Sequence, residues 1–265
     1  MKMKLILASA KDPAGKNIAA RLLELYDFHP ILSRPNVWVC GDVLLTTIAG
    51  EAVQISALPL TADEIIFVSR HASESGKPTL TTHVPGEPSK RELAIASPPT
   101  LKSALRELIV ARDELRLPYE VSLEETHHGQ TGLEILVTFV EIGSLPVQWR
   151  DKKAAEAVAR AIMAAATSPI KGRQAIGFGG PHYAPRHTQV VLRTDVCVGH
   201  ILPKYVAIDE GLVKHAIART SEGVELLALD WKGLDSGQRQ LLQQIAAKLG
   251  LRAVRESELL HQAKV

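Results

Sequence analysis

Histidines gather in a few short segments of this 265-residue chain. Seven of its ten histidines lie in or beside four segments: His71 and His83, His127 and His128, His182 and His187, and His200. Neutral imidazole binds metal ions and also accepts protons near pH 7, so histidines that converge can build a zinc site or an acid–base site. The sequence has no H-E-x-x-H motif and no cysteine–histidine finger, so such a site must be assembled from distant segments.

Glu141 is the acidic residue best placed to join these histidines. It lies near the end of an apolar run, residues 133–142, which is typical of a buried strand. A buried carboxylate costs free energy unless it is paired or binds a cation, and ligands of open α/β sheets collect at the carboxyl ends of strands. We therefore expect Glu141 to bind a metal ion or to activate water. A purely structural pairing with an arginine is the alternative.

Other motifs exclude several kinds of chemistry. The glycine-rich run at residues 177–180 is followed by Pro181 and His182, and it meets neither the Rossmann nor the P-loop spacing. No G-x-S-x-G motif supports serine catalysis. Cys197 lies in an apolar run, which predicts a core residue and not a nucleophile. The histidines and Glu141 remain the main candidates.

Apolar segments of strand length alternate with helical patterns, which predicts an α/β architecture. The expected strands are residues 4–9, 37–48, 64–69 and 133–142. The expected helices are residues 13–25, 100–115, 151–167 and 235–250, with aspartates as N-caps at Asp12, Asp151 and Asp235. Two stretches rich in Gly, Pro and His, residues 69–88 and 177–188, are expected to be irregular loops that carry function.

Length and composition set the broad class. The chain is 46% hydrophobic and 23% charged, as in a folded globular protein, and residues 1–265 are expected to form a single compact α/β unit or two closely packed lobes with an unassigned boundary. The first apolar run is too short for a signal peptide, and no later run approaches the roughly 18 to 20 residues of a membrane span. Two distant cysteines suggest a reducing cytoplasm. The net charge of +2 neither supports nor excludes nucleic-acid binding.

Six motifs, taken in order, resemble those of one family. They are residues 11–15 (KDPAG), 69–76 (SRHASESG), 127–129 (HHG), 139–144 (FVEIGS, followed by Trp149), 179–186 (GGPHYAPR) and 199–205 (GHILPKY). Together they resemble the D-aminoacyl-tRNA deacylases of archaea and plants, and they span nearly the whole chain. This resemblance implies a three-layer α/β/α fold with a mixed sheet, similar to the phosphorylase and peptidyl-tRNA hydrolase group.

The same resemblance implies a zinc-associated enzyme that cleaves the ester of D-aminoacyl-tRNA. It implies a broad range of D-amino acids and no membrane or DNA partner, and we expect a monomer. The implied metal ligands are His128, Glu141, His182 and His200, and the first three are also the implied catalytic residues. The implied substrate-binding residues are Ser69, Arg70, His71, His83, Tyr183, Arg186 and Lys204.

Simple water attack would suffice for such a reaction, because the aminoacyl ester is already activated. A bound zinc ion would lower the pKa of water and polarise the carbonyl. We expect chirality to be distinguished by a wall that excludes the L side chain, without recognition of the side chain itself. Two alternatives stay open at this point: a zinc-dependent amidohydrolase or peptidase acting on small molecules, and a tRNA-binding protein without catalysis.

Overall fold

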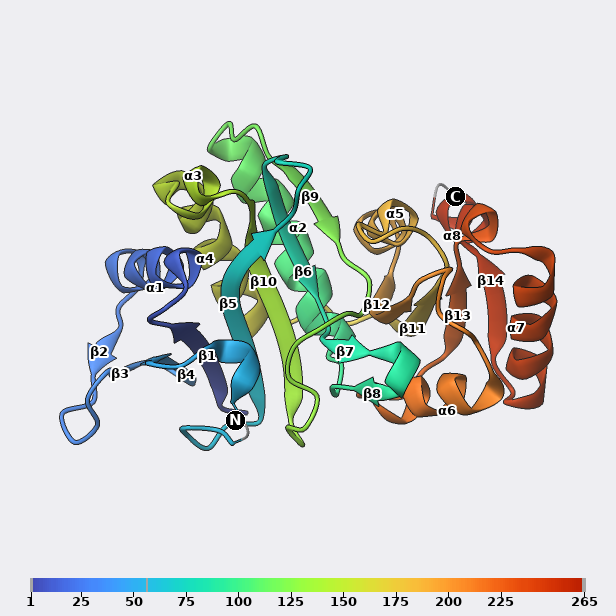
Figure 1. Cartoon of the computed structure of the whole chain (residues 1–265), viewed down its shortest axis with the longest axis horizontal. Coiled ribbons are helices and arrows are strands. Elements are labelled where there is room, and N and C mark those ends of the chain that lie inside the picture. The colour runs from blue at the N-terminus through green and yellow to red at the C-terminus, as the bar shows by residue number, and fades with distance from the viewer. Residues whose placement is uncertain (1, 56, 264–265) are drawn as a thin grey trace.

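The computed structural model describes residues 2–55 and 57–263, and the chain forms two main β-sheets side by side (Figure 1). The strands of the large sheet are β1 (Lys4–Ser9), β2 (His29–Pro30), β3 (Val37–Cys40), β4 (Val43–Ile48), β5 (Glu64–Ala72), β6 (Thr79–His83), β9 (Glu120–Leu123) and β10 (Leu136–Ser144). Their order is β2-β3-β4-β1-β5-β10-β6-β9. Strands β4, β1, β5 and β10 run parallel, whereas β6 is antiparallel to β10, so the sheet is mixed.

The small sheet is entirely parallel. Its strands are β11 (Arg173–Phe178), β12 (Val196–Leu202), β13 (Leu226–Leu229) and β14 (Arg252–Arg255), in the order β12-β11-β13-β14. A short hairpin of β7 (Gly86–Glu87) and β8 (Glu92–Leu93) lies beside it, with the 3₁₀ turn η2 (Pro88–Lys90) between its strands. One apolar cluster contains residues of both sheets, such as Phe67 and Val198, so the sheets pack through a shared core.

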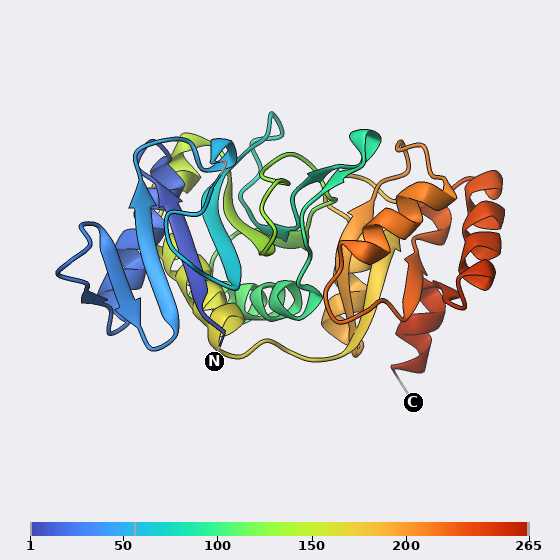
Figure 2. The ribbon, with the colours of Figure 1, turned by 90° about the horizontal axis from the view of Figure 1, so that it is seen from below.

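Helices cover the sheets in layers (Figure 2). They are α1 (Pro13–Leu25), α2 (Pro98–Glu114), α3 (Pro146–Trp149), α4 (Lys152–Thr167), α5 (Pro185–Arg193), α6 (Glu210–Ala218), α7 (Ser236–Lys248) and α8 (Glu256–Gln262). Helices α1 and α4 pack on one face of the large sheet, and the small sheet lies between α5 and α8 on one face and α6 and α7 on the other. Two further 3₁₀ turns are η1 (Ala52–Gln54) and η3 (Trp231–Gly233).

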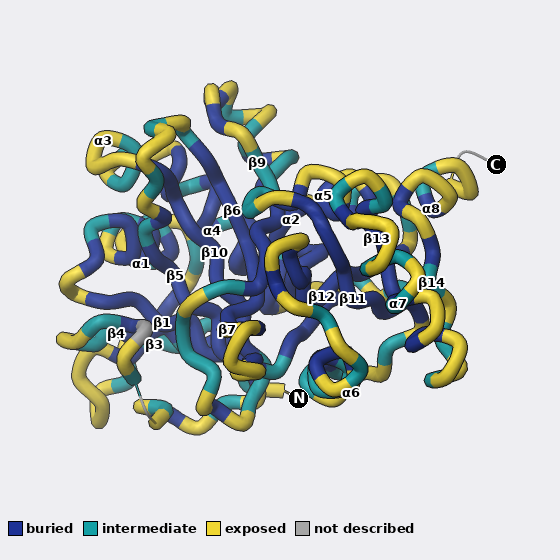
Figure 3. Tube along the Cα trace, turned by 45° about the vertical axis from the view of Figure 1, so that its right-hand side comes forward, coloured by how far each residue is buried: buried dark blue, intermediate teal, exposed yellow. Residues whose placement is uncertain are grey.

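The predicted three-layer α/β/α class with a mixed sheet is confirmed. Figure 3 shows the central strands as almost continuously buried, which is the pattern expected of parallel strands covered on both faces. Within the described part of the chain, no helix has the length and apolar character needed to cross a membrane.

Helix starts were predicted well because capping is local. The Asp12 side chain accepts a hydrogen bond from the Gly15 amide, and Asp151 and Asp235 cap α4 and α7 in the same way. The start of α2 was misplaced by two residues, since it begins at Pro98.

Some strand predictions were wrong. Residues 37–48 are not one strand but the antiparallel pair β3 and β4, which turns at Gly41 with a φ of +58°. Residues 69–88 were expected to be an irregular loop, yet they contain the end of β5 and all of β6 and β7. Strand β6 was missed because its sequence, TLTTH, is mostly polar although all five residues are buried.

Candidate active site

Strands β5, β10 and β6 bring the first site residues together. Ser69 on β5 lies in register with Glu141 on β10, and Thr81 on β6 faces Glu141 from the other side. The Ser69 hydroxyl donates a hydrogen bond of 2.5 Å to one carboxylate oxygen of Glu141. Glu141 is 1% exposed. The prediction that this carboxylate is buried in the sheet, near the carboxyl end of its strand, is therefore confirmed.

Glu124 and Glu125 are two further acidic residues of the site. They follow β9 directly, and backbone hydrogen bonds from Glu124 to Thr82 and from Glu125 to His182 hold this segment against its neighbours. Both glutamates are buried. The sequence analysis missed them, although an acidic pair just before His127 and His128, in the run L-E-E-T-H-H, could have indicated them.

Three histidines surround Glu124. A ring nitrogen of His71 lies 3.1 Å from a Glu124 carboxylate oxygen, and ring nitrogens of His127 and His182 lie 3.4 Å and 3.8 Å from the other oxygen. His71 is also 3.6 Å from Glu141. Segments that are far apart in the sequence therefore meet at the two carboxylates, as the histidine clustering had indicated.

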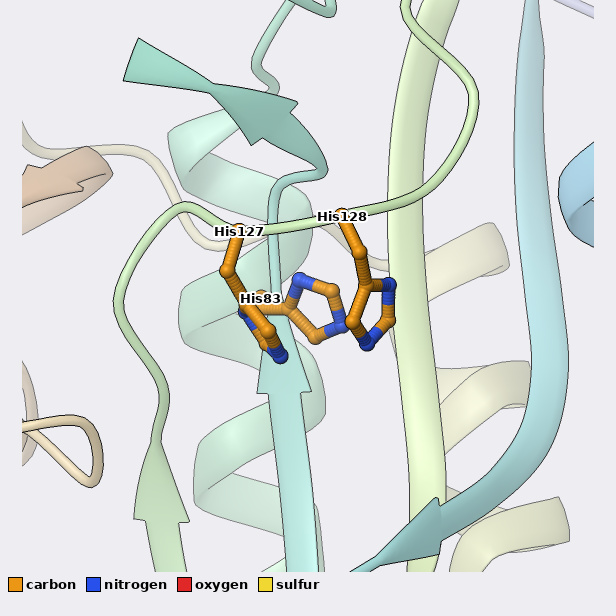
Figure 4. Close-up of side chains that lie close together, drawn as sticks. All are labelled: His83, His127 and His128. Carbon is orange, nitrogen blue, oxygen red and sulfur yellow. The ribbon is translucent and has the colours of Figure 1, made fainter. Parts of the chain in front are cut away.

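His83, His127 and His128 form a second group that adjoins the carboxylates. Figure 4 shows the three rings gathered where β6 ends, with His127 and His128 coming from the loop that crosses over it. The ring centroids of His83 and His127 are 4.3 Å apart, and those of His127 and His128 are 4.1 Å apart. A nitrogen of His83 lies 3.8 Å from Glu141, which connects this group to the carboxylates.

Burial sets the charge of these groups. Desolvation, followed by the neighbouring histidines, lowers the pKa of His83, and it lowers the pKa of His127 to about 3, so both rings are neutral at pH 7. Burial raises the pKa of the Glu124 carboxyl, and the charge of Glu141 raises it further. Among residues 2–55 and 57–263, the only basic side chains within ion-pair distance of Glu124 or Glu141 are histidines.

Three sets of side chains in this cluster could hold a metal ion, since their ligand atoms lie within 4.8 Å of one another. They are His71, Glu124 and His182; His83, Glu124 and Glu141; and His83, His127 and His128. Two sets share Glu124, and two share His83. The cluster can therefore bind a divalent cation or transfer protons between carboxylates and imidazoles.

A hollow of about 360 Å³ gives access to the cluster. We call it the histidine hollow, and it is lined by Arg70, His71, Ala72, Ser73, His127, His128 and His182. The hydroxyl of Tyr183 lies 3.0 Å from a nitrogen of His71. Glu125 lies behind His182, at 3.1 Å from its other ring nitrogen, and accepts a hydrogen bond from Tyr205.

Three of the residues expected in the site lie elsewhere. His200 is fully buried in the small sheet, where one ring nitrogen bonds to Thr126 and the other to backbone carbonyls, so it has no free nitrogen for a metal ion. Arg186 lines a different hollow next to α8, and Lys204 lies on an exposed loop outside the histidine hollow.

Comparison with known proteins identifies the family. A sequence model described as D-aminoacyl-tRNA deacylase matches residues 58–254, most of the chain. The chain belongs to the D-aminoacyl-tRNA deacylase family. Among curated deacylases, that of Pyrococcus furiosus is 34% identical over 96% of this chain and its own full length, and that of Methanosarcina mazei is 36% identical over 96% of this chain and 92% of its own.

A solved structure shares the fold of this deacylase family member over almost its whole length. It is the crystal structure of AF0625, a conserved protein of unknown function, with a TM-score of 0.89 and 28% sequence identity. The match covers 98% of this chain and 97% of the other. The large and small sheets therefore occur together, in the same arrangement, in an experimentally determined relative.

Proposed function

We propose that this chain hydrolyses the ester bond of D-aminoacyl-tRNA and releases a free D-amino acid and tRNA. One observation supports this more than any other: in a member of the D-aminoacyl-tRNA deacylase family, buried Glu124 and Glu141 lie among histidines at an accessible hollow. Hydrolysis of an activated ester needs a polarised carbonyl and a group that takes a proton from water. Such a cluster can provide both functions.

The donor atoms of the cluster fit the zinc ion that the family resemblance implies. Both carboxylate oxygens of Glu124, one of Glu141 and both nitrogens of His83 are buried without a hydrogen-bond partner. Buried charge without a counter-charge is costly, and zinc accepts carboxylate oxygens and imidazole nitrogens as ligands. We propose that zinc is held by Glu124 and Glu141 together with histidines among His71, His83, His128 and His182. When bound, zinc would lower the pKa of water and polarise the ester carbonyl.

The protein's own side chains orient the reaction. Ser69 fixes one oxygen of Glu141 and leaves the other, which has no hydrogen-bond partner, free to bind zinc, so we assign the role of accepting a proton to a histidine that does not bind zinc. Tyr183 restrains His71, and Glu125 restrains His182. His128 and His182 line the hollow, where they can contact the ester and move a proton to the leaving ribose oxygen.

Arg70 is the cation best placed for the tRNA end of the substrate. It lines the histidine hollow, and its guanidinium lies 3.3 Å from Asp12, which holds it in position. Phosphate contacts of this kind fix register and carry little sequence preference. Arg186 and Lys204 are proposed to contact tRNA outside the hollow. A cytoplasmic location and a monomeric state remain predictions.

The test is hydrolysis of D-tyrosyl-tRNA and L-tyrosyl-tRNA by the purified chain. We expect turnover of the D ester and little or none of the L ester. Absence of turnover for both esters would contradict the proposal and favour binding without catalysis, whereas cleavage of small peptides without tRNA would favour an amidohydrolase.

The role of zinc is tested separately. Chelation should abolish hydrolysis of the D ester, and added zinc should restore it. Turnover that survives complete removal of metal would leave a mechanism based on histidine and carboxylate alone.

A further inference from the structure

A second hollow adjoins the histidine hollow, because His127 and His128 line both. It has a volume of about 640 Å³ and is lined by residues of the β7–β8 hairpin, the loop after β12 and the start of α6. Figure 1 shows the hairpin and α6 near one another. We call it the α6 hollow. Besides the two histidines, its walls include Pro88, Arg91, Tyr205, Val206, Asp209 and Leu212.

The two hollows differ in charge. Of the described residues in the wall of the histidine hollow, Arg70 is the only charged one besides the histidines, and its partner Asp12, at 3.3 Å, is buried outside the wall. In the α6 hollow, Arg91 is paired with Asp209 at 2.5 Å and Glu87 with Lys90 at 3.2 Å, so the described residues of its wall offer no cation without a carboxylate partner. Since phosphate groups are recognised mainly by cations, the histidine hollow suits the phosphate end of the substrate better than the α6 hollow does.

The walls of the α6 hollow suit an uncharged organic group. Pro88, Val206 and Leu212 are buried apolar residues that contribute to it. Hollows of a few hundred cubic ångströms with apolar walls and a few polar groups are typical binding sites for small organic groups. The volume leaves room for an aromatic side chain.

We infer that the α6 hollow binds the side chain of the D-amino acid, while the terminal nucleotide of tRNA lies over the histidine hollow. This inference rests on the proposed function. An ester held at His127 and His128, which lie between the two hollows, must extend one substituent toward each of them. The charges then assign the phosphate-bearing nucleotide to Arg70 and the side chain to the α6 hollow. From the sequence, we expected that the amino-acid side chain is not recognised. Under this inference the α6 hollow contacts the side chain, and it is wide enough to accept many different side chains.

A bulky substitution in the α6 hollow tests this assignment. Ala207 is exposed, lines the α6 hollow and lies outside the histidine cluster, so Ala207→Trp can fill the hollow without disturbing the core. We expect it to lower kcat/KM for D-tyrosyl-tRNA by about 10- to 100-fold while that for D-alanyl-tRNA changes little. Ser236→Trp, at an exposed position on α7 that lines neither hollow, is the matched control and should leave the activity on both substrates unchanged. Ser89→Trp, from another part of the wall, should repeat the size dependence.

Substitution in the histidine hollow should have a different signature. Arg70→Gln should lower kcat/KM for the D-tyrosyl and D-alanyl esters by the same factor, because it acts on the nucleotide that they share. Equal losses for both esters in Ala207→Trp and Ser89→Trp would overturn the inference, since the hollow would then hold the nucleotide. Full activity on both esters in the two tryptophan variants would also overturn it.

A binding measurement separates this inference from the proposed function. The probes are the D-tyrosyl and D-alanyl amides of 3′-amino-3′-deoxyadenosine, which cannot be hydrolysed as esters. If the wild-type chain cleaves no ester, yet Ala207→Trp weakens only the D-tyrosyl probe, the proposed function fails and the side-chain site stands. If the wild-type chain is active but Ala207→Trp weakens both probes equally or neither, the function stands and the side-chain site fails.

Discussion

Two buried glutamates at opposite ends of the large sheet differ in what compensates their charge. Glu64 begins β5 and forms an ion pair with Lys4 of β1. Glu141 lies toward the other end of β10, the strand next to β5, and faces Ser69 and the histidines His71 and His83. Each glutamate is only 1% exposed.

We infer from this difference that Glu64 has a structural role and that Glu141 is available for chemistry. Lys4 supplies a fixed positive charge within the fold, so Glu64 needs no ligand. His83 is neutral at pH 7 because burial lowers its pKa, so it cannot compensate Glu141 in the same way. A carboxylate buried beside a neutral imidazole is available to bind a cation or a proton, and the proposed reaction requires such a group.

The largest effect is expected from neutralising the carboxylate among the histidines. Glu141→Gln keeps the size of the side chain but removes the charge, and hydrolysis of D-tyrosyl-tRNA should slow by about 10²- to 10⁴-fold. Single-turnover rates would measure this loss. Glu120→Gln, at an exposed position on β9, is the control and should keep the wild-type rate. A wild-type rate for Glu141→Gln would remove the distinction between the two glutamates.

The opposite pattern is expected at the other end of the sheet. Lys4→Met leaves Glu64 buried without a partner, so the free energy of unfolding should fall by about 3–5 kcal/mol while the rate per folded molecule is retained. Urea denaturation monitored by circular dichroism measures the loss. The double variant Lys4→Met/Glu64→Leu should regain much of the stability. Stability unchanged in the single variant would show that this pair is not structural.

His200 extends the comparison to histidines, because its ring nitrogens are bonded whereas those of His83 are not. Burial lowers the pKa of His200 to about 4, below the unfolded value of about 6.5. Its contribution to stability is therefore complete above about pH 6.5 and is lost as the pH falls toward 4. The free energy of unfolding of the wild type, taken relative to that of His200→Gln, should fall by on the order of 3 kcal/mol between pH 7 and pH 4.

Denaturation at a series of pH values measures this slope. His29→Gln is the matched control, since His29 is exposed. Parallel pH profiles for the wild type and His200→Gln would contradict the assignment of His200 as a buried neutral residue.

A smaller effect is expected from displacing one histidine without changing any charge. A Cβ atom at Gly143 would lie 2.8 Å from the His71 ring and 2.3 Å from Thr79, so Gly143→Ala must shift His71 relative to the carboxylates. We expect a loss in kcat of about 10- to 100-fold. Gly50→Ala, where a Cβ atom meets nothing within 4 Å, should keep full activity. Full activity in Gly143→Ala would show that the position of His71 is not critical.

Much of the fold could be predicted because its signals are local. Aspartate caps fixed the starts of three helices, and apolar runs marked β1 and β5. Strand β6 escaped prediction because its threonines are buried only through pairing with β10 and β9, and these contacts have no local signature.

The site was predicted only in part for a similar reason. Glu141 could be found because it interrupts an apolar run, and His71, which lies 3.6 Å from it, shares the histidine hollow with His128 and His182. Glu124 follows a short strand that was not predicted, so nothing local indicated its burial. His200 is in a family motif, yet it serves the packing of the small sheet.

The central claim is that the carboxylates among the histidines, and not those paired with lysine, bind zinc and carry the reaction. The most direct test measures bound zinc and D-tyrosyl-tRNA hydrolysis in the same preparations of the wild type, Glu124→Gln and Glu64→Gln. We expect Glu64→Gln to retain zinc and activity while it is folded, and Glu124→Gln to lose both. Wild-type zinc content and rate in Glu124→Gln would contradict the claim.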